Sequence, residues 1–228
     1  MTDNTKQAVP ATQALAQSGI ETASSPQVTI EFEARRCIHS RFCVLWQPQV
    51  YKANVQGPWI DPTADTVDAI VAVAHNCPSG AIRYKRHDGG PDEKSPAVNL
   101  IYIRENGPLA ARAEIVINGT PIGYRATLCR CGASQNKPFC DGFHSTAGFS
   151  ASGEPASVDT PVLTTRDGPL EILPQRNGPL RVRGNLEICS GTGRTVKRTT
   201  AEALCRCGHS RNKPFCDGSH AGVAFIAD

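Results

Sequence analysis

Residues 128–144 read LCRCGASQNKPFCDGFH, and residues 204–220 read LCRCGHSRNKPFCDGSH. The two stretches agree at fourteen of their seventeen positions, and both have the spacing C-x-C-x8-C-x3-H. Packing alone does not require four soft ligand atoms at fixed positions, whereas a metal centre does. The duplication therefore predicts two equivalent metal sites. Their candidate ligands are Cys129, Cys131, Cys140 and His144 in the first copy, and Cys205, Cys207, Cys216 and His220 in the second.

A zinc ion is one candidate occupant, because tetrahedral zinc sites use sets of three cysteines and one histidine. Zinc ribbons, however, usually carry C-x2-C knuckles rather than C-x-C. The turn NKP ahead of FCDG is also not typical of a zinc finger. A structural zinc protein is therefore kept as an alternative to an iron–sulfur protein.

Both stretches resemble the CDGSH iron–sulfur family, whose motif is C-x-C-x2-(S/T)-x3-P-x-C-D-G-x-H. The resemblance implies a [2Fe–2S] cluster in each loop, with one iron bound by two cysteines and the other by a cysteine and a histidine. The first copy departs from the motif, since Phe143 stands where the second has Ser219, so we do not expect equal reduction potentials. The other matching positions are Ser134, Pro138, Asp141 and Gly142, and Ser210, Pro214, Asp217 and Gly218.

A histidine ligand has consequences for such a cluster. Imidazole in place of a thiolate makes the cluster less negative and easier to reduce. Protons compete with iron for the coordinating nitrogen, so acid should promote loss of the cluster. We expect the double variant His144→Cys/His220→Cys to lose much of this acid lability, measured as decay of the visible absorption at acidic pH. Equal decay in the variant and the wild type would contradict histidine ligation.

A third group of cysteines, Cys37, Cys43 and Cys77, lies nearer the N-terminus, and Pro78 follows the last of them. A cysteine followed by proline closes the cluster loops of bacterial ferredoxins. Residues 28–86 resemble divergent single-cluster ferredoxin domains and small [3Fe–4S] ferredoxins, which implies one [4Fe–4S] or [3Fe–4S] cluster. His39 is the candidate fourth ligand, and a three-cysteine [3Fe–4S] site is the alternative.

Hydrophobic periodicity predicts the elements around this third group. Residues 28–34 alternate as a strand does, and residues 81–86 predict a returning strand. Residues 63–77 predict a helix, capped by Asp61 or Thr63 and ended by Pro78. The apolar positions at helical spacing are Val67, Ile70, Val71 and Ala74.

The tetrapeptide NGPL recurs at 106–109 and 177–180, ahead of the two duplicated loops, which indicates an internal duplication with one indel. We expect an α+β protein: a small ferredoxin-like α+β domain followed by two β-rich CDGSH-type repeats. Because CDGSH proteins with one motif form homodimers, the resemblance implies that the repeats form a pseudo-dimer within the chain. The predicted parts are a mobile tail (1–26), the ferredoxin-like domain (27–87), a polar linker (88–96), repeat 1 (97–150) and repeat 2 (151–228).

The bulk properties exclude several classes. The ten cysteines form three groups of three plus Cys189, which favours metal sites in a reducing compartment over disulfides. The net charge of +3, with dispersed Lys and Arg, gives no support for nucleic-acid binding. The longest apolar stretch, near residues 69–74, is too short to span a bilayer. We expect a cytoplasmic protein whose partners include neither nucleic acid nor membrane.

The predicted function is electron transfer through these three clusters. No nucleophile–base pair or phosphate-binding loop stands out, so we do not predict an enzyme. Storage of clusters and their delivery to apo-acceptor proteins is the second hypothesis. The expected partner is accordingly a redox protein or an apo-acceptor.

Overall fold

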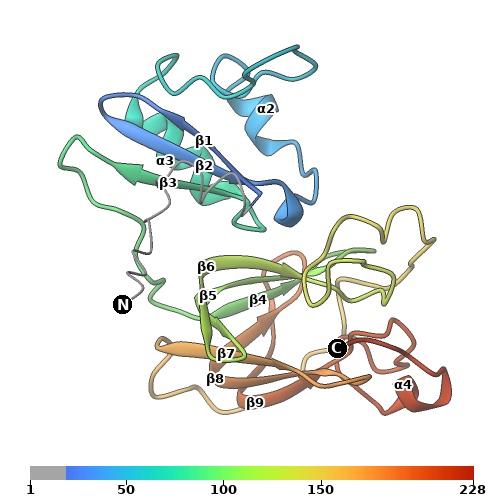
Figure 1. Ribbon diagram of the computed structural model, residues 1–228. Helices are drawn as coiled ribbons and strands as arrows, with labels where there is room; N and C mark the ends of the chain where they lie inside the picture. The colour runs from blue at the N-terminus through green and yellow to red at the C-terminus, as the bar shows by residue number, and fades with distance from the viewer. Residues whose placement is uncertain (1–18) are drawn as a thin grey trace, which may run out of the picture.

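The computed structural model describes residues 19–228 (Figure 1). These residues form a mixed structure, mostly β with few helices, in agreement with the α+β expectation. The buried apolar side chains gather into two separate cores, one within residues 28–82 and the other within residues 101–204. No helix in the described part of the chain is long and apolar enough to cross a membrane.

Three antiparallel strands build the N-terminal part, in the order β1 (Ile20–Ser24), β2 (Val28–Glu33) and β3 (Ile82–Arg86). The strands predicted at 28–34 and 81–86 are confirmed, because alternate residues of β2, Val28 and Ile30, face the core. The tail prediction is wrong for residues 20–24. They have little apolar pattern, but their backbone pairs along β2. Residues 1–18 lie outside the described residues.

Three helical segments follow β2 and pack beside this sheet: η1 (Ala34–Arg36), α2 (Phe42–Trp46) and α3 (Val67–Asn76). The predicted caps of α3 are wrong. Its N-cap is Thr66, whose Oγ1 accepts a hydrogen bond of 3.3 Å from the amide three residues on. Asp61 instead accepts hydrogen bonds from the amide and hydroxyl of Thr63, which closes a turn before the helix. The helix ends at Asn76 with Cys77 as its C-cap, before Pro78 as predicted.

Each repeat contributes one short strand and one long hairpin to the second part. Repeat 1 has β4 (Leu100–Ile103), β5 (Leu109–Ile117) and β6 (Thr120–Leu128). Repeat 2 has β7 (Pro169–Pro174), β8 (Leu180–Cys189) and β9 (Thr195–Leu204), followed by the short helix α4 (Ser219–Gly222).

The short strands join the two repeats. β4 pairs antiparallel with β5 of its own repeat and parallel with β8 of the other. β7 does the reverse, antiparallel to β8 and parallel to β5. The pairings β4-β5-β7-β8 therefore close into a ring, with β6 and β9 on the other edges of β5 and β8 (Figure 1). Apolar residues from all six strands fill one core, so the two repeats share it.

Arg36 joins the N-terminal part to repeat 1. Its side chain is only 4% exposed and donates hydrogen bonds of 2.5 Å to the carbonyl of Arg125 and 3.3 Å to that of Ile122. Its guanidinium also lies over the ring of Phe139, 5.3 Å from the centroid. Because Phe139 precedes a candidate ligand, this contact brings the N-terminal part against the first cysteine loop.

Arg125 makes the reciprocal contacts from β6. Its guanidinium donates to the carbonyls of Ala74, Cys77 and Ile82, the last two at 2.9 and 3.2 Å. The same group pairs with the carboxylate of Glu93 in the linker at 2.7 Å. Arg125 therefore satisfies the carbonyls at the end of α3 and the start of β3, next to a cysteine of the third group.

Candidate iron–sulfur sites

The cysteines and the histidine of the first duplicated loop come together in two pairs. The sulfur atoms of Cys129 and Cys131 are 3.8 Å apart, and the sulfur of Cys140 lies 3.3 Å from Nδ1 of His144. The second loop repeats this arrangement. There, the pairs Cys205/Cys207 and Cys216/His220 are separated by 3.8 and 3.5 Å.

These separations suit the binding of one metal atom by each pair. Two thiolates bound tetrahedrally at about 2.3 Å from a metal lie about 3.8 Å apart, by simple geometry. A thiolate at about 2.3 Å and an imidazole nitrogen at about 2.0 Å lie about 3.5 Å apart. The donor set of each loop therefore fits two metal atoms, one for the C-x-C pair and one for the Cys–His pair.

The hairpin of each repeat positions its cysteine pair. β6 ends at Leu128, and the loop then folds back, so that the amide of Cys129 donates to the carbonyl of Pro138 at 2.8 Å. The amide of Cys140 donates to the carbonyl of Thr127 at 2.9 Å, which extends the β-ladder to the second part of the ligand set. In repeat 2, the amides of Cys205 and Cys216 make the matching bonds to Pro214 and Ala203, both at 2.8 Å.

The aspartate of each DG turn ties the loop together. Asp217 accepts hydrogen bonds from the amides of Arg211 at 2.8 Å and Ser219 at 3.0 Å, and the bonds from Ser219 and Arg211 lower its pKa. We expect such an aspartate to cap a short helix carrying the histidine. In α4, however, the N-cap is Gly218 with no side-chain cap, so the carboxylate closes the whole loop instead. Asp141 accepts the equivalent bonds in repeat 1.

Backbone amides also face the sulfur atoms. The amide of Ala133 donates to the sulfur of Cys131 at 3.4 Å, and that of Gly142 to the sulfur of Cys140 at 3.4 Å. Hydrogen bonds of this kind to cysteine sulfurs are one of the ways in which proteins set the potential of iron–sulfur clusters. The loop therefore provides both ligands and tuning groups.

A buried arginine lies within each C-x-C pair, and sequence reasoning missed it. Arg130 is 1% exposed and Arg206 is 0% exposed. Each guanidinium donates to the glycine carbonyl of the NGPL turn of its own repeat, at 2.8 Å and 3.1 Å. Burial lowers the pKa of Arg130 to about 10, so it stays charged at neutral pH beside Cys205 of the other repeat. The sequence carries one signal for this role, because an arginine stands between the two cysteines in both copies.

The two C-x-C turns contact each other through their backbones. A Cβ atom added to Gly208 would lie 2.5 Å from the carbonyl oxygen of Cys131. A Cβ atom on Gly132 would collide in the same way with the carbonyl oxygen of Cys207. Each loop therefore needs glycine after its second cysteine, because the other loop occupies the space of a side chain.

Burial and hydrogen bonding shift the pKa values of several candidate ligands in the first loop. Burial raises the pKa of Cys140 to about 11 and lowers that of His144. The hydrogen bond between the paired thiols lowers the pKa of Cys131 to about 6 and raises that of Cys129. Metal binding must therefore displace protons from these sulfurs.

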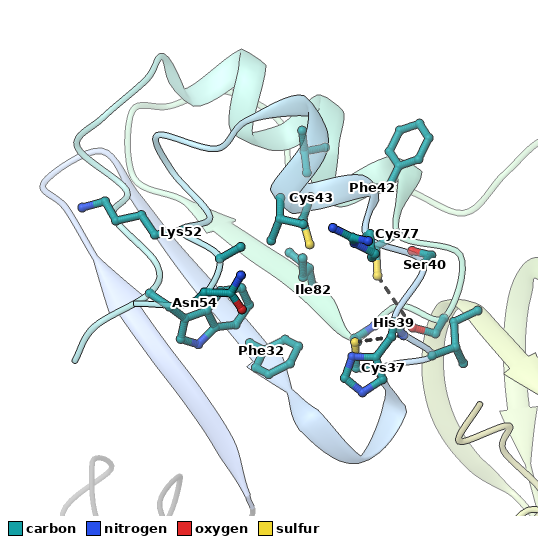
Figure 2. Close-up of a pocket in the computed structure, with 18 of the residues that line it drawn as sticks. Phe32, Cys37, His39, Ser40, Phe42, Cys43, Lys52, Asn54, Cys77 and Ile82 are labelled. Atoms are coloured by element: carbon teal, nitrogen blue, oxygen red, sulfur yellow. Dashed lines mark hydrogen bonds between the residues drawn. The ribbon is translucent and has the colours of Figure 1, made fainter. Parts of the chain in front are cut away.

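The third group of cysteines lines a pocket of about 430 Å³ in the N-terminal part. Cys37, Cys43 and Cys77 come from three segments: the end of η1, helix α2 and the end of α3. Figure 2 shows their sulfur atoms facing the same space. His39, the candidate fourth ligand, lines this pocket as well. The sequence grouping of these four residues thus corresponds to one place in the structure, and its donor set fits a ferredoxin-type cluster.

The loop between the first two of these cysteines has an unusual backbone. His39 and Arg41 have φ values of 54° and 61°, in the left-handed region that few side chains adopt. The turn directs the amide of His39 to the sulfur of Cys37 at 3.4 Å (Figure 2). The hydroxyl of Ser79 lies 3.7 Å from the sulfur of Cys77. A backbone amide and a hydroxyl therefore lie against the cysteine sulfurs here, and backbone amides do so in the duplicated loops.

Phe143 and Cys189, named in the sequence analysis, and His209 of the second loop all lie outside these ligand pairs. Phe143 is 45% exposed beside His144, and His209 is exposed while its amide donates to Cys207 at 3.5 Å. Cys189 is buried on β8 and has no place among the three groups.

Comparison with known proteins finds family-model matches over all three groups of candidate ligands. Residues 106–145 and 177–221 match the family model described as "Iron-binding zinc finger CDGSH type". Residues 23–87 match the model described as "Divergent 4Fe-4S mono-cluster". The paired ligands and these matches define an iron–sulfur class of protein. The chain carries two segments that match the CDGSH family model, after an N-terminal segment that matches the divergent 4Fe-4S mono-cluster model.

The chain is also similar to two curated bacterial proteins. It is 32% identical over 73 residues to the "Uncharacterized protein YjdI" of Escherichia coli (strain K12). The match covers 32% of this chain and 95% of that protein. The protein of the same name from Escherichia coli O157:H7 is similar to the same extent. The alignment therefore covers nearly all of the relative but only part of this chain.

Proposed function

We propose that the chain transfers electrons through three iron–sulfur clusters and is a carrier rather than an enzyme. Each duplicated loop would hold a [2Fe–2S] cluster, with one iron on its cysteine pair and the other on its Cys–His pair. Cys37, Cys43 and Cys77 would hold the third cluster, as [4Fe–4S] with His39 as fourth ligand or as [3Fe–4S] without it. The clusters supply one-electron chemistry, while the protein fixes their ligands and hydrogen bonds. A redox protein would be the partner.

The paired geometry supports clusters over zinc. Within residues 19–228, no three His, Cys, Asp or Glu side chains are grouped so that they could hold one metal ion. A zinc site of three cysteines and one histidine needs all four ligands around a single ion. A two-iron cluster needs two pairs of ligands instead, and each duplicated loop supplies two pairs.

The observation that carries the proposal is that the three ligand loops touch in series. The carbonyl oxygen of Ile38, next to Cys37, lies 3.8 Å from the position of a Cβ atom on Gly142. Ile38 also shares a pocket of about 490 Å³ with His144 of repeat 1. The side-chain amide of Asn136 donates to the carbonyl of Arg35 at 2.6 Å. The N-terminal loop therefore meets the ligand loop of repeat 1.

Repeat 1 is the middle member of this series. Its C-x-C turn contacts that of repeat 2 through Gly132 and Gly208. In the described chain, the hydrogen bonds from residues 19–87 to later segments end in the linker and repeat 1, and we find none to repeat 2. We infer that the repeats act as an intrachain pseudo-dimer, supported by the reciprocal pairing of β4 and β7. Electrons would pass between the N-terminal cluster and repeat 2 by way of repeat 1.

Removing one N-terminal ligand tests both the clusters and their order. Three clusters would bring about seven or eight iron atoms per chain, together with acid-labile sulfide. We expect Cys77→Ser to lose the iron and sulfide of the N-terminal cluster and to keep both [2Fe–2S] clusters. In EPR of the reduced protein, loss of that neighbouring spin should slow the relaxation of one [2Fe–2S] signal more than the other.

Cys189→Ser is the matched control. It also replaces a thiol that is shielded from solvent, since Cys189 is buried and Cys77 is half-buried, but Cys189 is not a proposed ligand. It should leave the iron content and both relaxation rates unchanged. Colourless, zinc-loaded wild type would contradict the clusters. If Cys77→Ser had an equal effect on both [2Fe–2S] signals, it would contradict the order.

Cluster delivery is the second candidate function, and the exposure of the Cys–His side of the repeat 2 site favours it. Cys216 is half-buried, whereas Cys140 is 2% exposed beneath the N-terminal part. Asp217 and Gly218 are also exposed. Incubation of the loaded protein with an apo-ferredoxin would separate the candidates. Movement of iron and sulfide supports delivery, and retention with fast electron exchange supports transfer of electrons.

A further inference from the structure

Helix α2 presents an apolar face to solvent, although it carries Cys43, a candidate ligand of the N-terminal site. The side chains of Leu45 and Trp46 are 65% and 58% exposed. The ring centroids of Trp46 and Phe42 lie 4.1 Å apart. Phe42, Leu45 and Trp46 stand at the helical spacing i, i+3 and i+4, so they share one side of the helix. We call these three residues the α2 face.

The other side of α2 does the packing. Cys43 and Val44 pack against the core of the N-terminal part, whereas no residue of the α2 face belongs to either core of the described chain. The sulfur of Cys43 and the ring of Phe42 point in different directions from the helix (Figure 2). Apolar side chains that share an exposed face, rather than lying scattered, indicate a surface for binding.

The chain around α2 is basic. Residues 34–60 contain four Arg and Lys residues and no Asp or Glu. Two of the four are paired with carboxylates from outside this segment. The other two, Arg35 and Arg41, are exposed and form no ion pair within residues 19–228. Arg41 also lines the cysteine pocket, and none of the described residues that line this pocket is Asp or Glu.

Phe42 extends the α2 face toward repeat 1. It lines the pocket of about 490 Å³ that contains His144, together with Arg104 and Glu105. The carboxylate of Glu105 accepts a hydrogen bond of 2.5 Å from the amide of Gly153. The α2 face therefore adjoins two of the proposed cluster sites, and basic residues flank it on both sides.

We propose that the α2 face is the docking surface for an acidic redox protein, which exchanges electrons with the cluster held by Cys37, Cys43 and Cys77. This inference rests on the proposed N-terminal cluster. In the exchange the reduced partner gives up one electron and the cluster takes it up, with no bond formed or broken and no proton moved.

The size and charge of the surface suit such a partner. Complexes that transfer electrons are among the smallest protein interfaces and bury less than about 1,200 Å², so a short apolar face is sufficient. The aromatic and aliphatic side chains of the α2 face would provide the contact. The basic residues beside it would steer a negatively charged partner toward the cluster and raise the rate of association.

Two other occupants fit this surface less well. A second copy of the chain would bring the same basic surface against itself, because a two-fold interface uses one patch from both copies, and like charges repel. Binding of a helix to a lipid surface scales with the apolar area that it buries, and α2 has only five residues. The structure therefore favours an acidic protein.

Leu45→Gln combined with Trp46→Gln in the full, cluster-loaded chain tests the inference. The probe is a reduced ferredoxin of strongly negative net charge, and the readout is the EPR signal of the N-terminal cluster in rapidly frozen samples. We expect the wild-type rate constant to fall about tenfold between about 0.05 and 0.5 M salt, because salt screens the steering charges. At low salt the variant should be about tenfold slower than the wild type. Its iron content and its reduction by dithionite should not change.

Ile226→Gln is the matched control, because Ile226 is 80% exposed but follows the ligand loop of repeat 2. It should keep the wild-type rate. A slower rate in this control and not in the α2 variant would place docking at repeat 2 and overturn the inference. The inference would also be overturned if the α2 variant lost binding to phosphatidylglycerol vesicles, or lost a dimer, while keeping its rate with ferredoxin.

Two further outcomes separate this inference from the proposed function. A rate that neither salt nor the α2 variant changes, with all three clusters present, would overturn the docking surface alone. If iron and sulfide analysis found no N-terminal cluster in the wild type, both this inference and that part of the proposed function would fail.

Discussion

Gly208→Ala should destabilise the protein by about 2–5 kcal/mol and reduce the iron content of both duplicated loops. The added Cβ would lie 2.5 Å from the carbonyl oxygen of Cys131 and 2.9 Å from its carbonyl carbon. These neighbours are backbone atoms of Cys131, a candidate ligand, so the clash cannot be relieved by a side-chain rotation. Overpacking costs about 1–3 kcal/mol, and a left-handed backbone, φ +84°, adds about 1–2 kcal/mol. Urea unfolding and iron analysis of the purified variant measure both effects.

Gly119→Ala is the control that separates strain from collision. Gly119 has nearly the same backbone, φ +78°, but nothing lies within 4 Å of its added Cβ. Its variant should therefore cost only the backbone part, about 1–2 kcal/mol, and keep its iron. Similar losses in the two variants would show that contact between the loops is not what makes glycine necessary at position 208.

The pairing of the candidate ligand residues was predictable because their information is local. The spacing within 128–144 and 204–220 places two pairs at one loop, and the structure brings both pairs to tetrahedral separations. The same holds for α3, because the spacing of apolar residues within its own ten positions predicts its buried face. The sequence even grouped Cys37 with Cys77, because the proline after Cys77 is a known closing signal.

What could not be predicted depends on partners far away in the chain. The bond from Arg130 to Gly107 spans 23 positions, and no local pattern indicates that a charged residue between two cysteines is buried. The parallel pairing of β4 with β8 joins Leu100 to Glu187, so it depends on both repeats folding together. β1 lacks apolar alternation because it is an edge strand held by backbone bonds.

The order of the three sites depends on long-range contacts of this kind. The N-terminal part could have met either repeat, since their loops are nearly identical in sequence. The choice of repeat 1 comes from residues outside the motif, above all Arg36 and Arg125. The position equivalent to Arg125 in repeat 2, four residues before Cys205 as Arg125 is four before Cys129, is Ala201. The duplicated repeats therefore differ where the N-terminal part attaches.

Arg125→Met should accordingly have an effect at least as large as that of Gly208→Ala. Arg125 is 4% exposed, and its removal leaves the carbonyls of Cys77 and Ile82 and the carboxylate of Glu93 without their donor. Breaking a buried pair in this way costs about 3–5 kcal/mol. We expect a fall of that size in the free energy of unfolding, and slower spin relaxation of the repeat 1 cluster because the N-terminal cluster is no longer held beside it.

Two further variants separate the causes of this loss. Arg112 lies directly opposite Arg125 in the β5–β6 register but is exposed, so Arg112→Met should change stability by no more than about 0.5 kcal/mol. Glu93→Gln combined with Arg125→Met removes the carboxylate left without its partner, and should recover part of the loss. If the double variant lost as much free energy of unfolding as its two single variants lose in sum, the ion pair would contribute nothing to holding the N-terminal part against repeat 1. The backbone carbonyls alone would then explain why Arg125 is needed.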